Sequence, residues 1–111
     1  MKIIKNFLKN RNIVETISYY DKPLIFIVKS NRKLYYIHWE DIQNNVDFYL
    51  VKLVNKKQIK NLKNNKITIR KLFQKRGKLF IWKIGKEETL YQSSLKNHIN
   101  EIPNVFLNLS N

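Results

Sequence analysis

The strongest constraint on the fold is a succession of four runs of β-branched and aromatic residues in the first half of the chain. They span residues 13–20, 24–28, 34–39 and 48–54. Runs of this length and composition are typical of β-strands. Polar turns at residues 21–23 and 30–33 separate the first three runs, and a polar loop over residues 40–47 precedes the fourth. Because short turns join consecutive strands, the pattern predicts an antiparallel meander.

Helical signals begin at Asn55, directly after the fourth run. Its side chain can accept hydrogen bonds from the free amides of a first helical turn. In the helix that follows, Ile59 and Leu62 are expected to face inward. The pair Asn64-Asn65 is expected to end this helix.

A second short helix is predicted to begin at Thr68, which is also a favourable capping residue. Its buried face would be formed by Ile69, Leu72 and Phe73, at positions i, i+3 and i+4 of one helical stripe. Residues 78–84 return to a strand pattern and predict a fifth strand.

Amphipathic patterns also occur at both ends of the chain. Residues 1–11 have apolar side chains at positions 3, 4, 7 and 8 with lysines between them, which predicts an N-terminal amphipathic helix. Residues 89–102 are interpreted as a helix that Pro103 would stop. Residues 103–111 are expected to form a docked tail or an edge strand.

Length and composition indicate one folded domain over residues 1–111. A chain with 43% hydrophobic and 13% aromatic residues can bury a core and is not a disordered basic tail. We expect no signal peptide and no membrane span, because no apolar run approaches about 18 residues. The absence of cysteine excludes disulfides and fits a reducing cytoplasm. The expected class is α+β, with a mostly antiparallel sheet of about five strands and two or three short helices packed on one side.

Two landmarks carry a resemblance to a known family. Residues 19–23 read Tyr-Tyr-Asp-Lys-Pro before an apolar strand, and residues 67–70 read Ile-Thr-Ile-Arg at a helix start. Over about residues 13–84 the chain resembles a family of small bacterial domains of unknown function, whose members read Tyr-Tyr-Asp-Gly-Pro and later Ile-Ser-Leu-Arg. Lys22 replaces the glycine of that turn. The resemblance implies an α+β sheet domain and implies no activity.

Charge is distributed very unevenly along the chain. Between Asp47 and Glu87 there is no acidic residue, while thirteen Lys and Arg side chains fall in that stretch and supply most of the net charge of +14. Codon usage rich in A and T also inflates lysine, and fits fifteen Asn and no Ala. Such usage should favour Asp and Glu as well, so the asymmetry exceeds what composition alone would give, and a solvated surface that reflects codon usage is the alternative interpretation. A positive field of this kind predicts a polyanionic partner.

The predicted helix pair over residues 55–76 would turn basic side chains outward to phosphates. The expected contacts are Lys56, Lys57, Lys60, Lys63, Lys66, Arg70, Lys71, Lys75 and Arg76. Lysine outnumbers arginine eighteen to four, which favours point-charge contact with the backbone over reading of bases. The sequence therefore predicts a non-catalytic basic module without a cofactor, which contacts nucleic acid or a ribonucleoprotein mainly through phosphates.

Size and composition also suggest a context. Small basic proteins from A/T-rich genes are common on phages and mobile elements, and we expect such an origin and a location in the cytoplasm of a bacterial host. An alternative is an anti-defence inhibitor of the anti-CRISPR type that binds a host nuclease complex, whose guide RNA is also a polyanion. Strand edges near residues 13 and 105 leave homo-oligomerisation open.

Aromatic side chains on the predicted strands suit either base stacking or core packing. Alternation along a strand places about half of them inside the domain. We expect Phe80 and Trp82 in the core. Tyr20 and Tyr35 are expected to be the exposed members available for stacking.

No catalytic or metal-binding residue is assigned from the sequence. His38 and His98 lie far apart without the paired carboxylates or close histidine spacing of a zinc or manganese site. His38 is expected to pack or form a hydrogen bond on the strand face of Tyr36. One enzymatic alternative stays open: a metal-independent, toxin-like ribonuclease that would use His38, Tyr36 and Arg70 if the fold brought them together.

Overall fold

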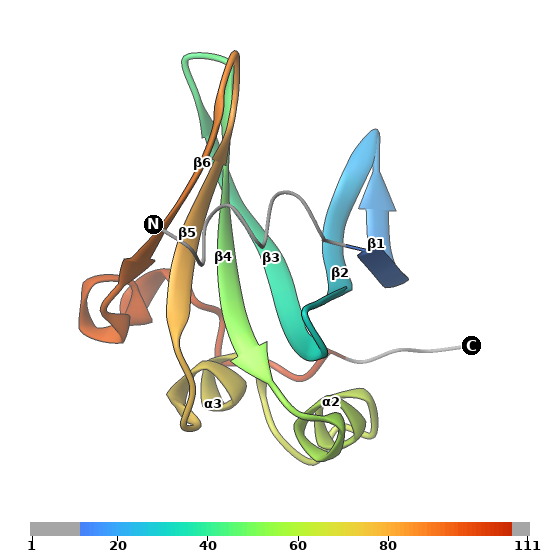
Figure 1. Ribbon diagram of the computed structural model, residues 1–111. Coiled ribbons are helices and arrows are strands. Elements are labelled where there is room, and N and C mark those ends of the chain that lie inside the picture. Colours follow the sequence, from blue (N-terminus) through green and yellow to red (C-terminus); the bar gives the residue numbers. More distant parts are fainter. Residues whose placement is uncertain (1–11, 108–111) are drawn as a thin grey trace.

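Six antiparallel strands pair in the order in which they follow one another along the chain (Figure 1). The computed structural model describes residues 12–107, apart from the side chains of Tyr19, Tyr20 and Pro23. The strands are β1 (Asn12–Tyr20), β2 (Lys22–Ser30), β3 (Lys33–Gln43), β4 (Val46–Val54), β5 (Leu79–Ile84) and β6 (Glu88–Ser93). The predicted meander is therefore confirmed, with six strands rather than about five.

Two-residue turns join β2 to β3 and β3 to β4. Asn31 and Arg32 have φ angles of 51° and 67°, and Asn44 and Asn45 have φ angles of 52° and 64°. Positive φ at both central residues matches the twist of a hairpin. The prediction of a polar loop over residues 40–47 was wrong, because β3 continues to Gln43. Ile42 and Gln43, at the end of β3, are exposed to solvent. A strand segment that buries neither face does not need alternating hydrophobic residues, so the sequence pattern did not reveal it.

A single residue, Asp21, lies between β1 and β2. Its φ angle is 62°, in the left-handed region that Asp tolerates better than most residues. Lys22 is outside this region and begins β2, so the turn does not need a glycine at that position. A lysine at position 22 is thus compatible with the turn.

The two predicted helices are confirmed as α2 (Lys56–Lys63) and α3 (Ile69–Gln74). Asn55 caps α2 through a reciprocal capping box: Gln58 N donates to Asn55 Oδ1 at 2.8 Å, and Asn55 N donates to Gln58 Oε1 at 3.0 Å. α2 ends at Asn64, as expected. Thr68 Oγ1 accepts a hydrogen bond from Lys71 N and so caps α3.

Both helices pack on one face of the sheet (Figure 1). Leu62 of α2 and Leu72 and Phe73 of α3 are buried there against Tyr36 and Leu50. The other face carries a second buried cluster, formed by Phe26, Val28, Tyr35, Ile37, Tyr49, Val51, Phe80, Trp82 and Leu90. The expected burial of Phe80 and Trp82 is confirmed, since each is 3% exposed.

The C-terminal part of the fold differs from the prediction. Residues 89–102 do not form one helix: β6 pairs with β5, and 3-10 turns follow at Leu95–Asn97 and Ile99–Glu101. The helical period predicted for these apolar residues was wrong: Leu90 is buried in the second core cluster as part of the edge strand β6, and an edge strand tolerates the polar residues beside it. Residues 105–107 form no strand, and Val105 O accepts a hydrogen bond from Ile69 N at 2.9 Å.

Two other expectations concern the ends of the chain. The predicted N-terminal helix over residues 1–11, and residues 108–111, lie outside the described residues. Within residues 12–107, α2 and α3 are both too short to cross a bilayer.

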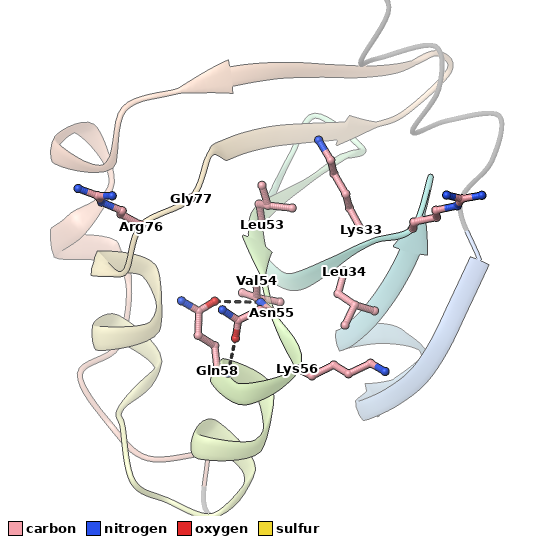
Figure 2. A pocket seen from close by; sticks show the side chains of 10 residues that line it. Lys33, Leu34, Leu53, Val54, Asn55, Lys56, Gln58, Arg76 and Gly77 are labelled. Atoms are coloured by element: carbon pink, nitrogen blue, oxygen red, sulfur yellow. Dashed lines mark hydrogen bonds between the residues drawn. The ribbon is translucent and has the colours of Figure 1, made fainter.

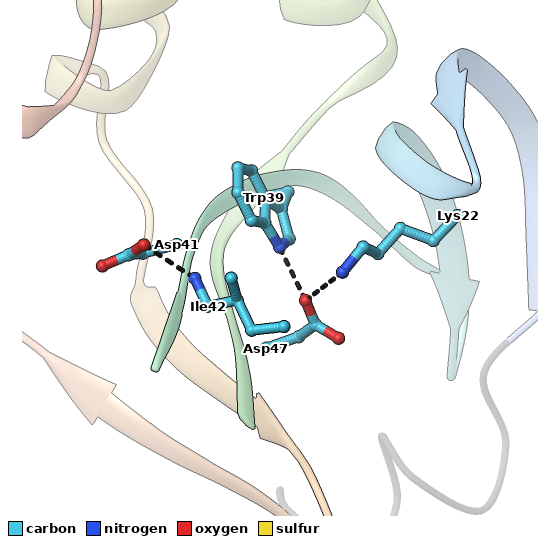
Figure 3. A network of polar contacts seen from close by, with 5 residues as sticks. All are labelled: Lys22, Trp39, Asp41, Ile42 and Asp47. Carbon is cyan, nitrogen blue, oxygen red and sulfur yellow. Dashed lines mark hydrogen bonds and ion pairs between the residues drawn. The ribbon is translucent and has the colours of Figure 1, made fainter. Parts of the chain in front are cut away.

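Asp47, at the start of β4, connects two other strands through its side chain (Figure 3). Lys22 Nζ lies 2.6 Å from Asp47 Oδ1, and Trp39 Nε1 donates to the same oxygen at 2.8 Å. The Lys22 ammonium also lies 5.5 Å from the centre of the Trp39 ring. Burial raises the pKa of Asp47, but the hydrogen bonds from Lys22 and Trp39 lower it by more. The network therefore stabilises the carboxylate form.

Asp47→Asn is expected to lower the free energy of unfolding at pH 7 by about 2 kcal/mol, because a hydrogen-bonded charge is lost. Since the folded-state pKa lies below 3.8, the unfolded chain binds the additional proton as pH falls through that region. The stability difference between wild type and variant should therefore shrink toward pH 2, as measured by urea unfolding. Glu87→Gln, an exposed change of the same charge, should have little effect at either pH. An equal Asp47→Asn difference at pH 7 and pH 2 would contradict the interpretation.

Candidate phosphate-binding surface

The basic surface begins where β4 passes into α2. The capping box holds the first turn of α2, and the buried side chain of Leu62 fixes which way the helix faces. Lys56, Lys57 and Lys60 are exposed as a result. No acidic side chain occurs in the first turn of α2 to compensate them.

A cleft of about 460 Å³ lies beside the start of α2. Three separate segments contribute cations to it: Arg32 and Lys33 at the β2–β3 turn, Lys56 on α2, and Arg76 in the loop before β5. In Figure 2, Lys56 and Arg76 lie on opposite sides of the cleft, with Lys33 above them. Leu34, Leu53 and Val54 form its apolar part, and none of the described residues lining it is acidic.

Arg32 occupies a costly backbone conformation in this cleft. Its φ angle of 67° lies in the left-handed region, which costs a residue of this type about 1 kcal/mol. The β3–β4 turn has the same two-residue form but places Asn45 at the corresponding position, where Asn is better tolerated. Arg32 therefore lowers the stability of the turn and at the same time places a positive charge at the edge of the cleft.

The loop that carries Arg76 is positioned by a buried lysine. Lys52 is 1% exposed, and its Nζ donates to Lys75 O and to Gly77 O, each at 2.6 Å. Burial lowers the pKa of Lys52. Gly77 has a φ angle of 135°, and a Cβ there would lie 2.6 Å from Leu53 O, so only glycine fits. Together, Lys52 and Gly77 fix the path of the chain on both sides of Arg76.

The nine basic residues predicted as contacts divide into two groups. Seven are exposed: Lys56, Lys57, Lys60, Lys66, Lys71, Lys75 and Arg76. The other two have partners within the fold. Lys63 Nζ lies 2.8 Å from Glu15 Oε1, and Arg70 Nε donates to Ile102 O at 2.8 Å. These two side chains therefore have structural contacts that compete with a role in binding.

Arg32 and Lys33 were not among the predicted contacts. They precede the acid-free stretch by many residues and read as an ordinary polar turn, so local charge density did not select them. The β2–β3 and β3–β4 pairings bring this turn beside the end of β4 and the start of α2. The sequence signal that could have identified Arg32 is the unusual presence of an arginine at the second position of a two-residue hairpin turn.

The expected stacking platform is not present at Tyr35. Tyr35 is 7% exposed and packs edge-to-face against Phe80, with ring centroids 6.3 Å apart. The expectation that Tyr35 is exposed was wrong, because both faces of the sheet carry a buried cluster. The tyrosine hydroxyl alone did not indicate whether the ring is buried. The side chain of Tyr20 lies outside the described part of the structure.

His38 and Tyr36 do meet, as expected. Tyr36 Oη and His38 Nδ1 are 3.0 Å apart, Tyr36 is fully buried, and burial lowers the pKa of His38 to about 4. Arg70, the third residue of the ribonuclease alternative, donates a hydrogen bond to the backbone carbonyl of Ile102 instead. The geometry thus gives His38 a packed, neutral state, and nothing in these contacts directs it toward a phosphate.

Glu15 lines a neighbouring pocket that shares Arg32, Leu34 and Lys56 with the cleft, whereas another group of acidic side chains surrounds the second histidine. Burial, a hydrogen bond with Glu101 and the charges of Glu101 and Asp41 together raise the pKa of Glu40 to about 7, and burial contributes most. Glu101 also lies next to His98. The expectation that His98 lacks neighbouring carboxylates was therefore wrong, because the fold joins residues that are remote in the sequence.

Comparisons with known proteins do not add a relative. No protein-family model, curated protein or solved structure matches the chain. The resemblance to the family of small bacterial domains stays a prediction, and the function has to be argued from the geometry.

Lys52→Met should lower the free energy of unfolding by about 2 kcal/mol, because the carbonyls of Lys75 and Gly77 lose the donor between them. Lys78→Met changes an exposed lysine in the same loop and should shift stability by less than about 0.5 kcal/mol. Urea unfolding monitored by tryptophan fluorescence measures both. Equal stabilities of the two variants would show that the buried ammonium is not needed to hold this loop.

Proposed function

We propose that the protein is a non-catalytic module that binds the phosphate backbone of nucleic acid, free or within a ribonucleoprotein. The cleft beside the start of α2 would hold phosphate groups, and the exposed lysines of α2 and α3 would extend the contact along the strand. The observation that carries the proposal is the convergence of Arg32, Lys33, Lys56 and Arg76 from three segments around one cleft without an acidic neighbour among its described lining.

Neighbouring like charges support this proposal because they are unfavourable in the free protein. Arg32, Lys33, Lys56 and Arg76 repel one another across the cleft, and at least Arg32 also occupies an unfavourable backbone conformation. A bound polyanion would offset both costs by neutralising the charges and releasing its own condensed counterions.

The chemistry of the side chains favours weak sequence selectivity. The exposed contacts on α2 and α3 are lysines, which bind phosphates as point charges and do not form the bidentate pairs that read bases. Tyr35, one of the two aromatic residues expected to stack on bases, is buried. The proposed partner is therefore a phosphate backbone with little base discrimination.

A host nuclease complex is the second form that such a partner could take. An anti-defence inhibitor would use the same cleft on guide RNA, and would keep its partner through protein contacts as well. Pull-down from a bacterial lysate, with and without prior digestion of RNA and DNA, separates the two. A protein retained after digestion favours the inhibitor, whereas loss of all captured material favours nucleic acid alone.

Binding should depend strongly on salt. If about five cations each neutralise one phosphate, log affinity for duplex DNA should fall against log salt with a slope of about −4 to −5. Fluorescence anisotropy with labelled RNA and DNA oligonucleotides over a range of potassium chloride concentrations measures this slope. A slope near zero, or no binding at low salt, would rule out the proposal.

Arg32→Asn tests the cleft without harming the fold. Asn at this position recreates the Asn-Asn turn found between β3 and β4, so stability should be unchanged or rise by up to about 1 kcal/mol. Affinity should fall several-fold and the salt slope should become less steep by about 1 unit. Lys86→Gln removes an equal charge from the β5–β6 turn, which is at the other end of the sheet in Figure 1, and serves as the control. Equal effects of the two variants would show that net charge, and not the cleft, determines binding.

A further inference from the structure

Three side chains capable of ligating a metal ion meet at the end of β3. Glu40 comes from β3, His98 lies between the two 3-10 turns that follow β6, and Glu101 belongs to the second of these turns. One ligand atom from each residue lies within 4.8 Å of the other two. The group is separate from the basic cleft, with which it shares no residue.

A β-bulge places Glu40 in this group. Trp39 pairs with Tyr49 and Asp41 pairs with Phe48, so Glu40 is an extra residue that has no partner in β4. Bulges of this kind redirect a side chain relative to its strand and are common beside functional sites. Glu40 is half-buried and lies beside Glu101.

The orientation of His98 is fixed from the other side of its ring. Ser93 Oγ and His98 Nε2 are 3.0 Å apart, so the hydroxyl oxygen can accept a hydrogen bond from Nε2–H. His98 Nδ1 is buried and has no hydrogen-bond partner among the described residues. It lies 3.6 Å from Glu101 Oε2, which is too long for a hydrogen bond.

This arrangement is what a metal-binding histidine requires. In the tautomer whose Nε2–H donates to Ser93 Oγ, the lone pair of Nδ1 points toward the two carboxylates. A buried nitrogen left without a partner is unfavourable, and a cation between the three groups would satisfy it. The same cation would take the place of the hydrogen bond between Glu40 and Glu101 and would compensate the charge of both carboxylates.

We propose that Glu40, His98 and Glu101 bind a divalent transition-metal ion, of which Zn²⁺ fits the ligand set best. One imidazole nitrogen and two carboxylate oxygens suit Zn²⁺, whereas Ca²⁺ and Mg²⁺ prefer oxygen ligands throughout. Ligands at about 2.1 Å from a tetrahedral ion are about 3.4 Å apart, so the three groups must close slightly around it. Glu101 has a side chain that is 53% exposed and is free to make that adjustment.

The ion would do two things in this fold. It would tie the 3-10 turns to β3, two parts of the chain that are remote in sequence and lack a shared strand ladder. With three protein ligands, it would also keep one position open for water or another small ligand. Binding at this site does not depend on the proposed function of the basic cleft, so either proposal can fail without the other.

The test uses the full chain after removal of metals with a chelator. Zn²⁺ titration by calorimetry should give one site per chain, and Co²⁺ should give visible absorption bands of a four-coordinate or five-coordinate centre. His98→Gln should abolish binding, and Glu40→Gln or Glu101→Gln should weaken it at least tenfold. Ser93→Ala, a change to the positioning residue, should weaken it about tenfold. Ca²⁺ should not compete at equal concentration.

Two controls separate the site from general surface binding. Glu87→Gln removes an exposed acid elsewhere, and His38→Gln removes the other histidine, so both should bind Zn²⁺ as wild type does. Nitrogen-15 NMR of the wild-type protein supplies a readout that needs no variant: Zn²⁺ should shift His98 Nδ1 and leave the His38 ring unchanged. Binding that survives His98→Gln, or an unchanged His98 Nδ1 signal at saturating Zn²⁺, would overturn the proposal.

Discussion

The buried ammonium of Lys52 is the interaction on which the helix-facing side of the sheet depends. A charge that is 1% exposed has to be satisfied, and the carbonyls of Lys75 and Gly77 do so at 2.6 Å each. This requirement fixes where α3 ends, how the chain passes Leu53 without a Cβ at Gly77, and where β5 begins beside β4. The only buried lysine among the described residues is thus part of the core, while its sequence neighbours form the surface.

The same constraint links the core to the proposed function. Arg76 lies between the two carbonyls that Lys52 holds, so its position at the cleft is set from inside the domain. Arg32 and Lys33 are set from a second direction by the hairpin between β2 and β3, and Lys56 by the capped start of α2. Each cation is therefore held on a fixed segment of backbone, which lowers the entropy lost when a partner binds.

Local chemistry made much of this fold predictable. The helix caps at Asn55 and Thr68 and the first four strands depend on interactions between residues that are close in the sequence. The sixth strand was missed because its six residues contain one buried apolar side chain, Leu90, and pair only because β5 offers a free edge. Non-local contacts also explain the site residues that were missed: Arg32 joins the cleft, and Glu40 joins His98, only after the sheet has formed.

The strand order has a consequence for how the chain acquires its structure. Every strand pairs with its immediate neighbours in the sequence, so the sheet contains no crossover and its ladder contacts between β1 and β4 span short stretches of chain. Pairing between strands that follow one another in the sequence reduces the loop entropy that must be lost before these native pairings form. The longest excursion is the α2–α3 segment between β4 and β5, which makes the closure of that segment over Tyr36 and Leu50 the natural slow step of folding.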